Sequence, residues 1–371
     1  MSKLRVAWDN CLAGQDKAGT GVYAARLLEQ FADRPDLQID VLNGWHHSPR
    51  SGVAASALRV AEDLFWTHAG LPAQLWKRDV DLLHAPAFVA PIASPRPVVI
   101  TIHDITYLLY PSHFSNWWIT YLKLVMPPAV KSAAVIICGS ENSKLDIVKA
   151  YGIPSAKVRV IPYGVDHERF HPNAILDRNW AQTLGIRDGY ILHVGTFSYR
   201  KNIPTLLRAV ADLRTRGTWG NRQVVLAGSQ RLSIKGGAEI LETIRELDLS
   251  DSVVVTGHMP DEHIPGLYAH ASMLVVPSLY EGFGFPVLEA MAVGTPVVCS
   301  NTSSLPEVAG DAAIFFPPHD HYALAGAMED LIQNPSIAEQ FRRKGFEQAR
   351  KFTWQSTAEK TIALYREVAK S

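Results

Sequence analysis

The strongest constraint on the fold is a repeated alternation between short, apolar, β-branched runs and longer amphipathic stretches. The first series of runs, which ends at Gly164, consists of LRVAWD, IDVLNG, VDLLHA, PVVITIHD, AVIICGS and VRVIPYG. After a polar, proline-bearing pause the pattern restarts with YILHVG, QVVLAGS, SVVVTG, SMLVVPS, PVVCSN and AAIFFPP. Runs of this kind between helical stretches are typical of parallel strands that are buried on both faces. The sequence therefore predicts an α/β fold with two doubly wound parallel sheets.

The length of 371 residues suits two domains of roughly 100–200 residues each. Because the pattern pauses at residues 165–180, we expect one domain over residues 1–170 and a second over residues 171–351. Residues 352–371 form a further amphipathic stretch with helical spacing of its apolar side chains. No strand separates this stretch from the helical one before it, so we expect a helix that crosses back to the first domain.

Composition excludes some partners. Lysine plus arginine and aspartate plus glutamate number 36 each, so no net charge draws the chain to nucleic acid or to an anionic membrane. Cys11, Cys138 and Cys299 lie far apart without CxxC or metal-type spacing, which favours a reducing compartment. The N-terminal residues lack the apolar run of a signal peptide, and no later stretch is long and apolar enough to span a membrane. We therefore expect a soluble, cytoplasmic protein that needs no metal or cofactor.

The stretch PSLYEGFGFPVLEAMAVGTPVVCSN, residues 277–301, contains two glutamates eight positions apart. Pro286 is a natural first-turn residue and Gly294 a natural stop, so Glu289 lies on a predicted helix and Glu281 precedes it. The amides of residues 282–285 would lie at the helix N-terminus, where donors and the positive dipole end favour an anion. The stretch therefore predicts a phosphate site.

The two glutamates are too far apart in orientation to share one proton, and we expect each to accept hydrogen bonds from hydroxyls of a different part of one ligand. Arg200 and Lys201, in GTFSYRKN after another strand, would face the same anion. The alternative reading is that all four are ordinary solvated residues.

Together these motifs carry a family resemblance. Residues 194–318, with VGTFSYRKN, LAGS, VTGHMPDEHIPGLYAHASMLVVPSLYEGFGFPVLEAMAVGTPVVCSNTSSLPEVAG and AAIFFPP, resemble the retaining nucleotide-sugar glycosyltransferases of family 4. The first half agrees through AGTGVY, TIHD, GSENSK and IPYGVD. The resemblance implies the GT-B architecture, in which two Rossmann-like domains face each other across a cleft. The N-terminal domain would bind the acceptor and the C-terminal domain the nucleotide-sugar donor.

The resemblance also implies roles in the second half of the chain. Glu281 would bind the donor sugar hydroxyls, and Glu289 would bind the ribose hydroxyls. Lys201 and Arg200 would neutralise the diphosphate leaving group. The other donor-binding residues would be Gly195, Thr196, Gly282, Phe283, Gly284 and Phe285. Many members have arginine where this chain has Thr196, so Arg200 would carry more of the charge than usual.

In the first half the resemblance places His103 beside the anomeric carbon, with Asp104 orienting it or the acceptor. Gly19 and Gly21 would let the backbone approach the donor phosphate or the acceptor, although a glycine-rich turn before a helix explains them equally well. Ser140, Asn142 and Ser143 are candidate acceptor contacts, and N-capping of a helix is their alternative explanation. The family often has asparagine where this chain has Tyr163.

Growing negative charge on the leaving diphosphate is the main charge that such a reaction must stabilise, and Lys201, Arg200 and the helix terminus supply preorganised donors. No pair of acids at a strand end suggests a metal, so the cations would replace Mg²⁺. The family outcome is retention of anomeric configuration. We see no carboxylate nucleophile, which favours same-face attack. TIHDITYLLYPSHFS looks like bacterial polysaccharide and O-antigen mannosyltransferases, which favours GDP-mannose as donor.

The acceptor would be a glycan or a lipid-linked glycan. Trp117, Trp118, Tyr121 and Leu122 lie near lysines on a predicted helix that could contact the inner face of a membrane, and core packing explains them equally well. The rival functions are a nucleotide-sugar epimerase and an inactive sugar-nucleotide-binding protein. A nicotinamide dehydrogenase is disfavoured because no strand is followed by GxGxxG and an acid about 20 residues on.

Overall fold

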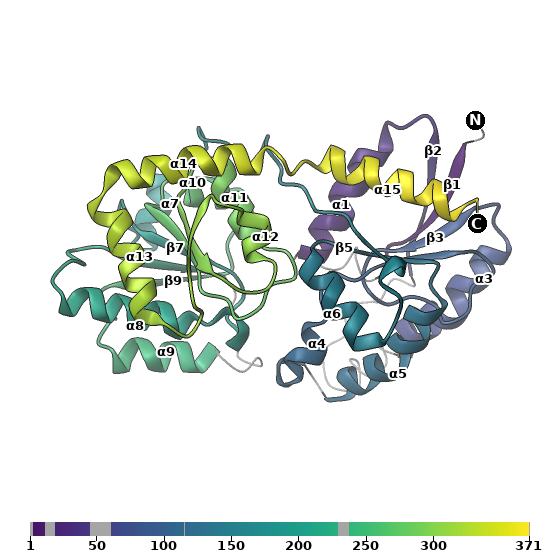
Figure 1. The fold of residues 1–371 in the computed structure, drawn as a ribbon, viewed down its shortest axis with the longest axis horizontal. Coiled ribbons are helices and arrows are strands. Elements are labelled where there is room, and N and C mark those ends of the chain that lie inside the picture. The colour runs from purple at the N-terminus through teal and green to yellow at the C-terminus, as the bar shows by residue number, and fades with distance from the viewer. Residues whose placement is uncertain (1–2, 12–18, 45–60, 115, 229–236, 371) are drawn as a thin grey trace. The chain divides into compact units, whose positions relative to one another are not determined.

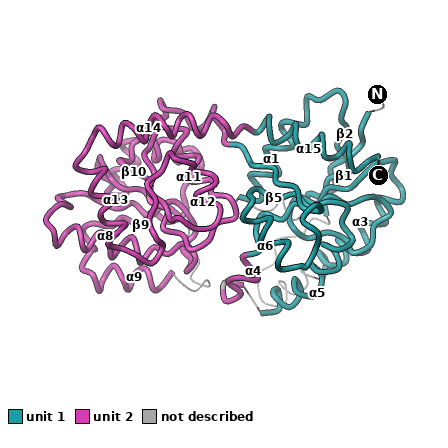
Figure 2. Tube along the Cα trace, in the orientation of Figure 1, with its two compact units in different colours: residues 1–105, 116–164, 354–371 teal, residues 106–115, 165–353 magenta. Residues whose placement is uncertain are grey.

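The computed structural model describes residues 3–11, 19–44, 61–114, 116–228 and 237–370. Contacts divide the chain into two compact units (Figure 2). The first contains Met1–Ile105, Asn116–Gly164 and Trp354–Ser371, and the second contains Thr106–Ser115 and Val165–Thr353. The expected domain bounds did not place Thr106–Ser115 with the second unit. Each unit contains one six-stranded sheet in which all strands are parallel (Figure 1).

The sheet of the first unit has the order β2-β1-β3-β4-β5-β6. Its middle strands are buried along their whole length, which explains why their residues are apolar apart from His84 and Thr101. In the register of this sheet Val6 lies opposite Leu82, and Leu83 lies opposite Val98. The strands are β1 Leu4–Asp9, β2 Leu37–Leu42, β3 Leu82–Ala85, β4 Val98–Thr101, β5 Val135–Cys138 and β6 Val158–Val160.

The helices of the first unit follow the predicted amphipathic stretches. They are α1 Gly19–Ala32, a π-helical turn Trp66–Gly70 that leads into α3 Leu71–Trp76, α5 Asn116–Ser132, α6 Glu141–Tyr151, a 3₁₀ turn Ser155–Lys157 and α15 Trp354–Val368. α15 packs against α1. Its periodic apolar side chains are all buried, namely Trp354, Ala358, Ile362, Tyr365 and Val368. The Thr357 hydroxyl donates to the Pro162 carbonyl, 2.9 Å away.

The sheet of the second unit has the order β12-β11-β10-β7-β8-β9. The chain therefore adds β8 and β9 on one side of β7. It then returns and adds β10, β11 and β12 on the other side. The strands are β7 Ile191–Val194, β8 Val224–Ala227, β9 Val253–Gly257, β10 Met273–Val276, β11 Val297–Ser300 and β12 Ala313–Phe316. Leu192 lies opposite Leu274 where β7 and β10 pair.

Two groups of helices accompany this second sheet. One group contains α8 Ile203–Thr215, α9 Gly237–Glu246 and α13 His321–Gln333, with α8 in contact with both others. The other contains α10 Ile264–Ala269, α11 Phe285–Val293, α12 Leu305–Ala309 and α14 Pro335–Ala349, with α11 in contact with the other three. The remaining helices of the unit are α4 Thr106–Leu109, α7 Arg178–Thr183 and the 3₁₀ turns Pro111–His113 and Tyr199–Lys201. The two predicted doubly wound sheets are therefore confirmed.

Candidate functional site

The strand order of the second unit places a switch point between β7 and β10. At such a point the loops that follow two neighbouring strands lead to opposite helix layers, and they leave a crevice beyond the carboxyl ends of the strands. The loop after β7 contains Arg200 and Lys201, and the loop after β10 contains Glu281. The fold thus brings together residues that are 80 positions apart in the sequence.

Hydrogen bonds hold these two loops against each other. The Leu279 amide donates to the Arg200 carbonyl, 2.7 Å away. Asn202, whose backbone is left-handed with φ 53°, donates its side-chain amide to the carbonyls of Pro277, at 3.0 Å, and Pro318, at 2.6 Å. Asn202 was not among the predicted site residues. An asparagine at a strand end just before a helix is a signal for such a role, because asparagine tolerates this backbone conformation.

Lys201, Arg200 and Glu281 form a buried charge cluster. The Lys201 ammonium donates to Glu281 Oε1 at 2.6 Å, and the Arg200 guanidinium donates to Glu281 Oε2 at 2.9 Å. The Ser278 hydroxyl also donates to Oε1, at 2.6 Å. Lys201 is 5% exposed and Glu281 is 7% exposed. Among the described contacts two cations share one carboxylate, so these three side chains together carry a net positive charge at the switch point.

The pKa of Glu281 shows which effect dominates in this cluster. Burial by itself would raise the pKa, but the charges of Lys201 and then Arg200 outweigh it and hold the pKa well below its usual range. Hydrogen bonds from Lys201 and Ser278 act in the same direction. Glu281 is therefore a carboxylate and not a proton donor.

The glycine run leads into α11 as predicted. Gly284 is the N-cap residue, with φ 115°, Pro286 lies in the first turn, and Gly294 ends the helix with φ 88°. The Ser303 hydroxyl accepts a hydrogen bond from the Glu281 amide at 2.9 Å. The Ser304 hydroxyl donates to the carbonyl of Glu281 at 2.9 Å and to that of Phe283 at 2.7 Å.

Serines are thus part of this site, although the sequence analysis did not select them. Ser278, Ser303 and Ser304 follow strands β10 and β11, and short hydroxyl side chains after neighbouring strands were the available signal. Phe283 is 5% exposed, with its ring packed against those of Phe285 and Phe352. The aromatic side chain of Phe283 therefore packs in the core, and the predicted contact of this residue with the nucleotide-sugar donor would be made by its backbone.

Glu289 has a separate partner. It accepts a hydrogen bond from the Tyr268 hydroxyl at 2.8 Å, and burial raises its pKa. No hydrogen bond joins it to Glu281 among the described residues, whereas Glu281 contacts the cations. The two glutamates of the 277–301 stretch therefore sit in different environments, as their orientation along the chain predicts.

Gly195 and Gly228 make room for the Lys201 side chain and for the end of β7. A Cβ at Gly195 would lie 2.9 Å from Lys201 Cε, and a Cβ at Gly228 would lie 2.0 Å from the Gly195 carbonyl oxygen. Both have positive φ, 154° and 157°. Thr196 is half-buried beside them. The observed role of Gly195 is to admit Lys201, and donor binding by Gly195 and Thr196 stays a prediction.

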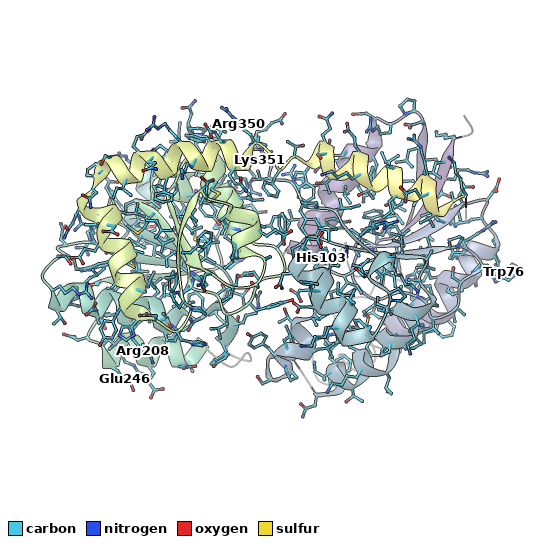
Figure 3. The ribbon with its side chains drawn as sticks, in the orientation of Figure 1. Trp76, His103, Arg208, Glu246, Arg350 and Lys351 are labelled. Atoms are coloured by element: carbon cyan, nitrogen blue, oxygen red, sulfur yellow. The ribbon has the colours of Figure 1, made fainter. Side chains whose placement is uncertain are left out.

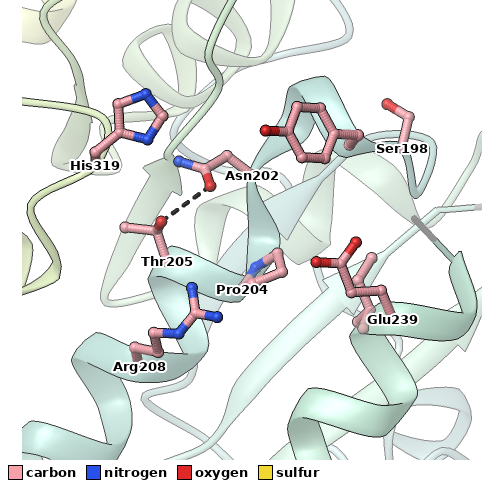
Figure 4. A pocket seen from close by; sticks show the side chains of 9 residues that line it. Ser198, Asn202, Pro204, Thr205, Arg208, Glu239 and His319 are labelled. Carbon is pink, nitrogen blue, oxygen red and sulfur yellow. Dashed lines mark hydrogen bonds between the residues drawn. The ribbon is translucent and has the colours of Figure 1, made fainter. Parts of the chain in front are cut away.

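A polar pocket of about 250 Å³ lies on the α8 side of the same loop (Figure 4). In the close-up Arg208 and Glu239 come from α8 and α9, and Thr205 donates to the Asn202 side chain at 2.9 Å. The pocket is lined by Ser198, Tyr199, Asn202, Pro204, Thr205, Arg208, Glu239, Ile240 and His319. None of these lining residues was a predicted site residue.

His193 is a further buried polar residue behind the cluster. Its Nδ1 donates to the Val275 carbonyl at 2.9 Å, and burial lowers its pKa to about 4, with the charge of Lys201 acting in the same direction. His193 is therefore neutral at physiological pH. In the described part of the chain no group of three His, Cys, Asp or Glu side chains is arranged to hold a metal ion.

In the first unit His103 is half-buried just beyond the end of β4, and Asp104 lies next to it in the chain (Figure 3 labels His103). Tyr163 Oη lies 2.8 Å from His103 Nδ1, and the Pro86 carbonyl lies 3.0 Å from His103 Nε2. Gly19 and Gly21 lie in the first turn of α1, with Gly19 exposed and Gly21 buried. Donor binding by these glycines stays a prediction.

The candidate acceptor residues at the start of α6 have structural partners. Ser140 is the N-cap residue and accepts from the Ser143 amide at 3.1 Å. The Ser143 hydroxyl donates to the His103 carbonyl at 3.2 Å, and Asn142 donates to Asp146 at 2.9 Å. Ser140 and Ser143 are fully buried. These contacts match the N-capping alternative, and acceptor binding stays a prediction.

The α5 residues considered for membrane contact differ in their exposure to solvent. Trp117 is 48% exposed, Trp118 and Tyr121 are half-buried, and Leu122 is buried. Core packing therefore accounts for Leu122, and membrane contact stays a prediction for the others. Within the described residues, no helix combines the length and hydropathy needed to cross a membrane.

Comparison with known proteins gives the family. Two family descriptions match the chain, "Glycosyltransferase Family 4" over residues 18–169 and "Glycosyl transferases group 1" over residues 178–348. The O-antigen chain mannosyltransferase B of Escherichia coli is 31% identical over 295 residues, which cover 77% of this chain and 74% of that protein. The chain is a family 4 glycosyltransferase.

This glycosyltransferase is also 34% identical to an MMP alpha-(1->4)-mannosyltransferase of Mycolicibacterium hassiacum over 233 residues, or 61% of this chain and 52% of that protein. A solved sucrose-phosphate synthase from Thermosynechococcus elongatus matches with a TM-score of 0.77 and 23% identity over the whole of both chains. The Anabaena protein HepE in complex with UDP and glucose matches with a TM-score of 0.75 and 20% identity, over 98% of this chain and all of that one. The fold is that of GT-B glycosyltransferases.

Proposed function

We propose that this glycosyltransferase transfers a hexose, mannose from GDP-mannose, to a glycan or lipid-linked glycan in bacterial surface polysaccharide synthesis. The observation that carries the proposal is the buried cluster of Lys201, Arg200 and Glu281 at the switch point of the second sheet. The mannosyltransferase relatives support mannose as the transferred sugar. The proposed setting is the cytoplasm, with peripheral contact at the inner face of the membrane.

The cluster suits a diphosphate leaving group because its positive charge is already held in place. When the bond from the anomeric carbon to the diphosphate breaks, negative charge grows on the departing oxygens and positive charge grows on the sugar. Lys201 and Arg200 stabilise the former, together with the amides at the start of α11. Since these groups are fixed before the reaction, little reorganisation is needed in the transition state.

Glu281 and Glu289 take the hydroxyls of the donor in this proposal. Glu281 is ionised, so its oxygens are acceptors for sugar hydroxyls as well as for the cations. Glu289 lies on α11 and accepts from Tyr268, and it would accept from the ribose hydroxyls in addition. The backbone of Gly195, Thr196 and residues 282–285 would complete the donor site.

In the first unit we propose that His103 and Asp104 act beside the anomeric carbon, with Gly19 and Gly21 close to the donor. We further propose retention of configuration through same-face attack, in which the departing phosphate oxygen receives the acceptor proton. The reaction is proposed to need no metal, with Lys201 and Arg200 supplying the positive charge that a divalent cation supplies elsewhere.

Ligand-induced stabilisation is the first test. We would titrate the purified protein with GDP, UDP, ADP and NAD, with and without EDTA, and follow the melting temperature. At about 100 times its dissociation constant a ligand adds about 2.7 kcal/mol of stability. We expect GDP to stabilise the wild type equally in EDTA and to have little effect on Lys201→Ala. Stabilisation by NAD alone, or by none of the four, would contradict the proposal.

Turnover separates the transferase from its rivals. We would incubate the protein with GDP-mannose and a synthetic alkyl mannoside, and analyse the sugar by NMR. Mannose linked to the mannoside with the donor's anomeric configuration is the expected product. A changed nucleotide sugar without transfer would instead indicate an epimerase, and binding without any change would indicate a sugar-nucleotide-binding protein.

A further inference from the structure

The ring of His103 is held from both of its nitrogens. A carbonyl oxygen only accepts hydrogen bonds, so the Pro86 carbonyl, 3.0 Å from Nε2, requires the proton to be on Nε2. In a neutral ring Nδ1 is then an acceptor, and the Tyr163 hydroxyl, 2.8 Å away, donates to it. For the neutral ring these two contacts fit one tautomer and one orientation.

Tyr163 is fixed in place by packing. It is 1% exposed, and its ring centroid lies 4.8 Å from that of Tyr23 and 5.5 Å from that of His103. A Cβ on Gly139 would lie 2.8 Å from Tyr163 Cε2, so the ring occupies space that only glycine leaves open at that position. Burial also raises the pKa of Tyr163 well above its usual value, so its hydroxyl keeps its proton and remains a donor.

Tyr23 contacts the same histidine in a different way. Its ring centroid lies 5.0 Å from that of His103 in an edge-on arrangement, while its hydroxyl lies 3.1 Å from Thr101 Oγ1. Thr101 Oγ1 is in turn 2.8 Å from His84 Nε2. Tyr23 is as deeply buried as Tyr163, but its hydroxyl bond is to Thr101. The two tyrosines therefore form a matched pair, of which only Tyr163 has its hydroxyl bonded to a His103 nitrogen among the described contacts.

We infer that Tyr163 is a positioning residue that keeps His103 in the tautomer with Nε2 protonated and keeps its ring in one orientation. The part of the inference that concerns catalysis rests on the proposed function, in which His103 acts beside the anomeric carbon. In this tautomer Nδ1 accepts from Tyr163 and Nε2 donates to Pro86, so both nitrogens are engaged and His103 orients the site rather than removing the acceptor proton.

The tautomer is measured directly by nitrogen NMR of protein labelled at its histidine rings, with the His103 signals assigned from His103→Gln. We expect the wild-type His103 ring to carry its proton on Nε2. Tyr163→Phe keeps the ring and removes only the donor, and it should shift the Nδ1 resonance of His103. Tyr23→Phe should leave that resonance in place. A wild-type proton on Nδ1, or an Nδ1 signal unchanged in Tyr163→Phe, would overturn the inference.

Kinetics test the catalytic part, with GDP-mannose as the donor. A neutral hydrogen bond of ordinary strength corresponds to a factor of about three to ten in rate. We expect Tyr163→Phe to lower kcat by that factor with the KM for GDP-mannose within about twofold of the wild type. Tyr23→Phe should keep the wild-type kcat. Equal kcat in both variants, or a change in KM alone, would overturn the positioning role.

The two readouts separate this inference from the proposed function. If the wild type transfers no sugar but its His103 proton lies on Nε2 and responds to Tyr163→Phe, the proposed function fails and the tautomer assignment stands. If the wild type is active and the two tyrosine variants behave alike in both readouts, the proposed function stands and Tyr163 is only a packing residue. The wild-type spectrum is assigned with His103→Gln and does not depend on Tyr163→Phe, so it decides the tautomer even if Tyr163→Phe does not fold.

Discussion

The pairing of Lys201 with Glu281 makes a quantitative prediction about stability. The two groups are 2.6 Å apart and are 5% and 7% exposed, so solvent screens their interaction little. Removing one partner of a buried ion pair costs about 3–5 kcal/mol, because the other charge is left without its partner. Lys201→Met leaves Glu281 with Arg200 and Ser278, so we expect the lower end, about 3 kcal/mol.

A double-mutant cycle isolates the pair itself. We would compare Lys201→Met, Glu281→Gln and the double variant by urea unfolding. Each single variant should lose about 3–5 kcal/mol, or roughly 6–20 °C in melting temperature for a unit of this size. The double variant should lose about 2–3 kcal/mol less than the sum of the singles, which is the coupling energy expected for residues in direct contact.

A surface pair in the same unit provides the control. Arg214 and Asp251 are 3.0 Å apart, but their side chains are 34% and 73% exposed. The cycle of Arg214→Met and Asp251→Asn should give a coupling of about 0.2–1 kcal/mol. If the Lys201–Glu281 coupling were no larger than that of this exposed pair, the reasoning from burial would be refuted.

The same variants should change GDP binding in opposite directions. Glu281→Gln removes the carboxylate that partly neutralises Lys201 and Arg200, so GDP, which carries no hexose for Glu281 to contact, should bind about tenfold more tightly. Lys201→Met removes a cation and should weaken binding by about tenfold or more. Calorimetry at fixed ionic strength gives both signs. A loss of GDP affinity in both variants would place Glu281 in direct contact with the nucleotide.

Three further predictions follow from individual sites. Burial raises the pKa of Asp9 from 3.8 to about 6, so its contribution to stability is complete below about pH 4 and is lost as the pH rises through 6, a loss of about 3 kcal/mol. Asp9→Asn should therefore raise the melting temperature at pH 8 and flatten its dependence on pH, and an unchanged pH profile would contradict this. Gly228→Ala, whose Cβ meets the Gly195 carbonyl at 2.0 Å, should lose more than about 4 kcal/mol in urea unfolding, whereas Gly217→Ala, with positive φ and open space, should lose only about 1–2 kcal/mol. Glu289→Gln should weaken GDP binding about three- to tenfold by calorimetry, and unchanged binding would remove Glu289 from the ribose site.

Much of the fold follows from the sequence for a simple physical reason. A parallel strand covered on both faces needs apolar residues at successive positions, and strands such as Val135–Cys138 and Met273–Val276 meet this need without interruption. The stops of the helices are equally local, as Gly294 shows with its left-handed φ of 88°. Sequence patterns of this kind depend on a few neighbouring residues, and they predicted every strand of both sheets.

The contacts between site residues are harder to predict from the sequence, because they join residues that are far apart along the chain. The sequence placed Lys201 and Glu281 at strand ends, but it is the adjacency of β7 and β10 that puts the ammonium on the carboxylate. The polar groups that hold the loops come from residues without a distinctive motif, as Asn202 and Ser304 show. Ser140 illustrates a local case, because a hydroxyl at a strand end predicted either an acceptor contact or a helix cap, and the cap of α6 is observed.

Glu281 forms an ion pair with Lys201 and Arg200, and the proposed function also gives it a contact with the donor sugar. Arg200 and the buried Lys201 would repel each other, and burying Lys201 would cost several kilocalories per mole in desolvation, unless an anion lay beside them. Glu281 supplies it, and its low pKa shows that the cations more than offset the cost of burying it. In the proposed function a diphosphate would bring its own negative charge to Lys201 and Arg200, and the carboxylate would then be available to sugar hydroxyls. The ion pair seen here and the sugar contact implied by the family resemblance are therefore compatible, because an ionised carboxylate has enough acceptor positions for both.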